Sequence, residues 1–139
     1  MTGRPPVDAE DRPHPELAAC LAHLRQGNPF AAHEDLEAAW RREGDVLCRQ
    51  DAARGLIQLC AAFVQRGRGN PYGARVLAMR ARERLGLPAP AHVDAALCRA
   101  GIDRPLLAAR LGTLPGDVGR WPPPWVLVTG RDNEEAGPS

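Results

Sequence analysis

Three residues in one short segment have the chemistry and the spacing of a functional site. His33, Glu37 and Trp40 follow one another at intervals of four and three residues. On a helix this spacing places them within one arc of about 120°. An imidazole and a carboxylate one turn apart can hold a cation or bind a polar ligand together. The sequence therefore predicts a polar site on this segment.

The surroundings of this pair predict that it is buried. The same arc contains Phe30 and Leu36, so we expect the pair to lie within an apolar stripe that faces the core. A buried carboxylate destabilises the fold unless a proton, a cation or hydrogen-bond donors compensate for it. Gln58 and Gln65 share one face of the next expected helix, with Arg54 near it. That face is the predicted partner of the pair.

Three interpretations of the site remain open. His33 and Glu37 could ligate one divalent metal ion, although zinc sites use three or four protein ligands and no further histidine is obviously placed. The same residues with Gln58 and Arg54 could form a buried hydrogen-bond network in a noncatalytic interaction or structural module. They could also anchor a small ligand in a pocket with Trp40 as its wall. The sequence names neither the metal nor the ligand.

Signatures of common enzyme classes are absent from the sequence. There is no phosphate-binding loop, no GxGxxG and no nucleophile elbow, and the single serine is the last residue. A serine hydrolase is therefore excluded. Catalysis would require metal-assisted or acid–base chemistry by His33 and Glu37, so whether the protein is an enzyme stays undecided.

The segments around the site predict an all-α fold. Helix start and stop signals recur, whereas alternating patterns are almost absent and only Trp125 to Thr129 looks strand-like. Asn-Pro pairs begin the second and fourth of the expected helices, and glycines end several. We expect helices at about 15–26, 29–43, 46–66, 71–85, 91–100 and 104–111.

An internal repeat predicts how these helices are connected. QGNPFAA at 26–32 matches RGNPYGA at 68–74, and each joins the end of one helix to the start of the next. The sequence thus predicts a small antiparallel bundle built from consecutive helical hairpins. Arg75 and Met79 occupy the second-copy positions of His33 and Glu37, so the hairpin does not require the polar pair.

The motifs together resemble a known family. The segment from Asn28 to Trp40, with its HxxxExxW motif, and GLIQLCAAFVQRGRGNPYGA at 55–74 resemble the bacterial and archaeal domain of unknown function 309 family, over residues 15–86. The resemblance implies an all-helical fold, no established activity and a metal at the motif as the hypothesis to test. The family pattern often has histidine where Gln65 stands here, and an amide is a poorer transition-metal ligand than imidazole.

Composition limits the domain organisation and the partners. With 139 residues, 44% of them hydrophobic and 25% charged, we expect a flexible segment at 1–14, one bundle at 15–112 and a partly disordered Pro/Gly-rich tail at 113–139. A net charge of +1 favours neither nucleic acid nor membranes as partners. The start of the chain lacks the apolar core of a secretory signal, so a cytoplasmic location is expected. An unknown small ligand, a protein or a second copy of the chain remain as partners.

Overall fold

The computed structural model describes residues 15–41 and 51–131, without the side chain of Trp40. The described residues form seven α-helices and one short 3-10 helix, η3, and contain no strand. This confirms the all-α prediction. In chain order the elements are α1 (Pro15–Arg25), α2 (Pro29–Arg41), α3 (Asp51–Gly67), α4 (Pro71–Leu85), α5 (Ala91–Arg99), α6 (Arg104–Leu111), η3 (Val118–Arg120) and α7 (Pro124–Thr129).

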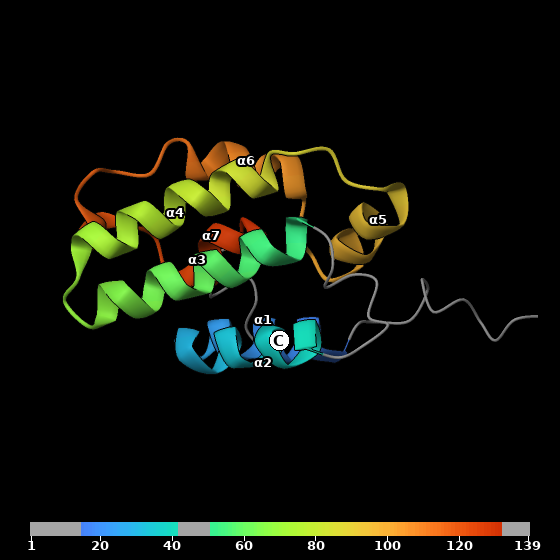
Figure 1. Ribbon diagram of the computed structural model, residues 1–139, viewed down its shortest axis with the longest axis horizontal. Coiled ribbons are helices and arrows are strands. Elements are labelled where there is room, and N and C mark those ends of the chain that lie inside the picture. The colour runs from blue at the N-terminus through green and yellow to red at the C-terminus, as the bar shows by residue number, and fades with distance from the viewer. Residues whose placement is uncertain (1–14, 42–50, 132–139) are drawn as a thin grey trace, which may run out of the picture.

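Two antiparallel hairpins form the body of the bundle, as the repeat predicts. Helix α1 packs against α2, and α3 packs against α4. Helix α3 lies in the middle, with α4 on one side and the α1–α2 hairpin on the other (Figure 1). Helix α6 packs on α4, and α7 contacts both α6 and α1. The end of the bundle therefore returns to its first helix.

The two hinges of the repeat have the same backbone geometry. Gly27 and Gly69 adopt left-handed conformations with φ of 78° and 77°, which glycine reaches without a steric penalty. Asn28 and Asn70 then cap the following helices, because each side-chain oxygen accepts a hydrogen bond from the backbone N–H three residues further on, at 3.1 and 3.0 Å. The predicted helix starts are thus confirmed at the level of individual hydrogen bonds.

Gly55 permits the close approach of α3 and α4. A Cβ atom added at this position would lie 2.7 Å from Leu85 Cγ and 3.2 Å from the carbonyl oxygen of Ala81. Both residues are fully buried, so neither side chain can move aside freely.

Gly55→Ala is therefore expected to lower the free energy of unfolding by about 1–3 kcal/mol, because overpacking outweighs the gain in helix propensity. Urea denaturation measures the change. Gly67→Ala serves as the control, since a Cβ atom at position 67 meets nothing within 4 Å. A Gly55→Ala protein as stable as the wild type would show that the two helices can separate without cost.

The strand-like segment Trp125–Thr129 is in fact helical, so that prediction was wrong. It lies in α7, which begins at Pro124 and ends at Gly130 in a left-handed conformation with φ of 73°. The guanidinium of Arg110 on α6 donates to the carbonyl oxygen of Leu127 near the end of this helix. β-Branched residues favour strands locally, but here burial on α1 and α6 decides the conformation.

The segment after residue 112 packs on the bundle as far as α7. Trp121, Leu127 and Val128 belong to the same buried cluster as the helices of the hairpins. The expected flexible segment at 1–14, the expected helix ends within 42–50 and the last part of the expected tail, 132–139, lie outside the described residues. Within the part that is described, no helix is long and apolar enough to cross a membrane.

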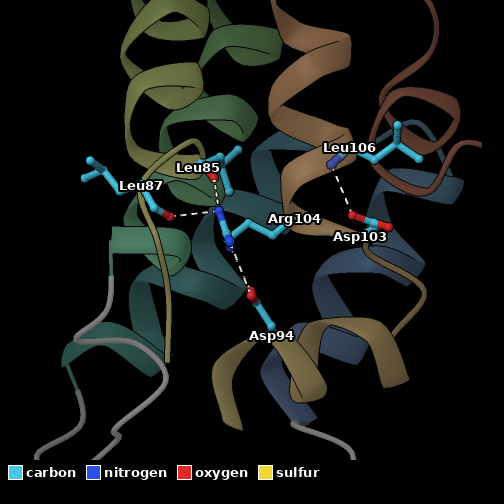
Figure 2. A network of polar contacts seen from close by, with 6 residues as sticks. All are labelled: Leu85, Leu87, Asp94, Asp103, Arg104 and Leu106. Atoms are coloured by element: carbon cyan, nitrogen blue, oxygen red, sulfur yellow. Dashed lines mark hydrogen bonds and ion pairs between the residues drawn. The ribbon is translucent and has the colours of Figure 1, made fainter. Parts of the chain in front are cut away.

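The buried side chain of Arg104 on α6 connects this helix with α5 and with the C-terminal end of α4. Arg104 Nε and Nη2 donate to the two carboxylate oxygens of Asp94 on α5, at 2.7 and 3.2 Å. Its Nη1 donates to the carbonyl oxygens of Leu85 and Leu87, each at 2.7 Å. Figure 2 shows the guanidinium between these three acceptors. The side chain thus satisfies carbonyl groups at the end of α4 that the helix itself leaves unpaired.

Candidate functional site

His33 and Glu37 lie at the edge of the buried face of α2. Ala32, Leu36 and Ala39 form that face, and α2 contacts both α1 and α3. The side chains of His33 and Glu37 are 23% and 21% exposed, so both are half-buried. Trp40 belongs to the last turn of α2, and its side chain lies outside the described residues.

The buried face of α2 is rotated about the helix axis relative to the face that the sequence predicts. Phe30, expected to face inward, is 52% exposed. Ala32 and Ala39 lie on nearly the opposite side of the helix from Phe30 and are fully buried. The buried face of α2 therefore consists of Ala32, Leu36 and Ala39, and Phe30 lies outside it.

The polar pair is held together loosely. His33 Nε2 lies 3.5 Å from Glu37 Oε1, and His33 Nδ1 lies 3.9 Å from Glu34 Oε2. Arg41 Nη2 approaches Glu37 Oε2 at 3.7 Å. These distances exceed those of good hydrogen bonds. The described residues therefore leave hydrogen-bonding capacity on both ring nitrogens of His33.

The residues expected opposite the pair have other environments. Gln65 Oε1 accepts a hydrogen bond from Asn70 Nδ2 at 3.0 Å and so belongs to the second hinge. Gln58 Oε1 is buried and has no hydrogen-bond partner within the part of the chain that the structure describes. Arg54 is exposed and has a contact of its own. Among the described residues, no hydrogen bond or ion pair joins either glutamine to His33 or Glu37.

The donor set around the pair falls short of a metal centre. In the described ranges, no group of three or more His, Cys, Asp or Glu side chains could hold a metal ion. His33 and Glu37 alone supply two ligands, whereas zinc sites use three or four from the protein. His23 pairs instead with Asp35, at 2.5 Å between Nδ1 and Oδ2, and so connects α1 to α2.

Two cysteines meet in the core between α1 and α3. Cys20 Sγ and Cys60 Sγ are 4.0 Å apart, and both thiols are free. The hydrogen bond with Cys60 and burial raise the pKa of the Cys20 thiol. The thiol therefore stays protonated and packs as a small hydrophobic side chain.

The fold and the site define a small helical-bundle domain with a half-buried polar pair on its second helix. Residues 17–77 match the family model described as a domain of unknown function (DUF309), and this match confirms the resemblance. The matched segment contains both hinges, Gly55 and the His33–Glu37 pair, and it ends within α4. No curated protein and no solved structure matches the chain.

Proposed function

We propose that the protein is a noncatalytic interaction module that binds a protein partner through one stripe of α2. The α2 stripe consists of Phe30, His33, Glu37 and Arg41, which lie on the rim of the helix rather than on its alanine face. The observation that carries the proposal is the state of His33. Its ring is half-buried, yet among the described residues neither nitrogen has a well-formed hydrogen bond.

The composition of the α2 stripe suits a protein interface. Aromatic residues and arginine are enriched at such interfaces, and Phe30 and Arg41 supply one of each. Between them, the His33–Glu37 pair offers a donor and an acceptor that a partner can engage without first unfolding any part of the bundle. A single exposed phenyl group is common on protein surfaces. Phe30, however, lies next to His33 and Glu37, which form no good hydrogen bond with each other.

Other functions receive less support from the same residues. Acid–base catalysis needs a substrate site beside the reacting groups, and the pair has only Glu34 and Arg41 as charged neighbours among the described residues. Metal binding would require at least one more ligand from outside those residues or from a partner. A small ligand on the pair would lack the partner face expected from Gln58 and Gln65.

A photo-crosslinking amino acid tests the proposal directly. Placed at position 30 and expressed in cells of the native host, it is expected to form one discrete protein adduct, because Phe30 would lie against the partner. The same amino acid at Leu106 is the matched control, since Leu106 on α6 is 51% exposed and Phe30 is 52% exposed. His33→Ala should abolish the adduct while changing the free energy of unfolding by less than about 1 kcal/mol.

Two results would contradict the proposal. The first is an adduct pattern that is the same at positions 30 and 106, or that His33→Ala leaves unchanged. The second is near-stoichiometric metal in untagged protein, lost in both the His33→Ala and the Glu37→Ala variants. That second result would assign the pair to a metal centre instead.

A further inference from the structure

A pocket of about 320 Å³ opens between α1, α5 and α7, away from the α2 stripe. We call it the α1–α5–α7 pocket. Its volume falls at the lower end of the range for small-molecule sites, which suits a ligand of one or two rings. The residues that line it are Ala18, Leu21, Ala22, Arg25, Ala96, Arg99, Ala100 and Trp125.

The lining combines apolar walls with a single kind of polar group. Alanines, Leu21 and the indole ring of Trp125 supply the apolar surface. The polar side chains among the lining residues are those of Arg25 and Arg99. Both guanidinium groups are hydrogen-bond donors, and neither can accept. A ligand that satisfies them must therefore supply the acceptors.

The two arginines of this pocket have no acidic partner among the described residues. The Arg25 guanidinium lies 5.7 Å from the centroid of the Trp125 ring and forms a cation–π contact with it. Within residues 15–41 and 51–131, neither Arg25 nor Arg99 forms an ion pair with a carboxylate. Two uncompensated positive charges thus flank an apolar pocket.

We propose that the α1–α5–α7 pocket binds a small organic carboxylate with an aromatic body. The carboxylate would accept hydrogen bonds from Arg25 and Arg99, and the ring would pack on Trp125 and the alanine walls. The proposal is independent of the α2 stripe, because the pocket contains no residue of α2. Either can fail without the other.

Titration calorimetry with 2-naphthoate tests this, with uncharged 2-naphthamide as the matched probe. We expect the carboxylate to bind about tenfold or more tightly than the amide, because only the carboxylate makes charge-assisted hydrogen bonds to the arginines. Arg99→Met keeps the apolar stem and should cost about tenfold in affinity for 2-naphthoate. Trp125→Phe leaves a smaller ring on the apolar wall, and should weaken binding by a smaller factor. Arg80→Met on α4 is the control, because Arg80 is exposed and outside the pocket.

Three outcomes would overturn the proposal. One is no binding of 2-naphthoate, and another is equal affinity for 2-naphthoate and 2-naphthamide. The third is an affinity that Arg99→Met lowers no more than Arg80→Met does, which would indicate general attraction to a basic surface.

Discussion

Trp121→Ala is expected to lower the free energy of unfolding by about 3–5 kcal/mol, the usual range for removal of a buried tryptophan. Trp121 is buried and packs edge-on against Phe63 of α3, with ring centroids 5.6 Å apart at an interplanar angle of 71°. Its indole N–H donates to the carbonyl oxygen of Pro115 at 2.8 Å. Removing the side chain leaves a cavity under α3 and a carbonyl without its donor.

Trp121→Phe separates these two contributions. A phenyl ring retains much of the edge-on packing and loses only the hydrogen bond and part of the volume, so we expect a cost of about 1–2 kcal/mol. Urea denaturation followed by far-ultraviolet circular dichroism measures both variants, and that signal does not depend on the tryptophan that is replaced. If Trp121→Ala is as stable as the wild type, the segment after α6 contributes nothing to the core.

Arg104→Met is expected to destabilise the protein by about 3 kcal/mol, because it leaves buried acceptors without their donor. The carbonyl oxygen of Leu85, the carbonyl oxygen of Leu87 and the Asp94 carboxylate all lose hydrogen bonds. Asp94 is 34% exposed, so water can form hydrogen bonds with its carboxylate when Arg104 is replaced. The Asp94 carboxylate therefore contributes only a small part of the expected loss of stability. The carbonyl of Leu85 has no such access, since its bond to Arg104 is buried.

Asp94→Asn and Arg104→Lys are the matched variants for this network. Asparagine keeps an acceptor for the Arg104 guanidinium, so its cost should stay near 1 kcal/mol. Lysine keeps the positive charge but cannot reproduce the planar fork that serves three acceptors, so its cost should fall between those of the other two. Equal stability of Arg104→Met and Asp94→Asn in urea denaturation would show that the ion pair, and not the carbonyl groups, carries the effect.

The family segment and the rest of the chain contribute different features. Residues 17–77, the segment that matches the family model, contain the whole α2 stripe. The α1–α5–α7 pocket needs α5 and α7, which lie beyond that segment, and Arg104 and Trp121 also belong to the later part. The later helices therefore close the bundle onto α1 and create the second candidate site.

The sequence by itself predicts the start of a helix where the capping residues are near neighbours in the chain. The Asn-Pro pairs predict where α2 and α4 begin, and the hydrogen bonds of Asn28 and Asn70 confirm both starts. Such caps involve groups a few residues apart, so a local pattern suffices to predict them. The repeat of the hinge likewise predicts the hairpins.

Only the tertiary structure decided which face of α2 is buried and which distant groups meet. His33 and Glu37 were expected inside the core, but Ala32, Leu36 and Ala39 form the buried face of α2, so the polar pair lies at its rim. The helical conformation of α7 and the three acceptors of Arg104 depend on residues far along the chain. Whether a helix face is buried depends on the shape of the neighbouring helices as well as on its own residues. The periodicity within one helix carries no information about those neighbours.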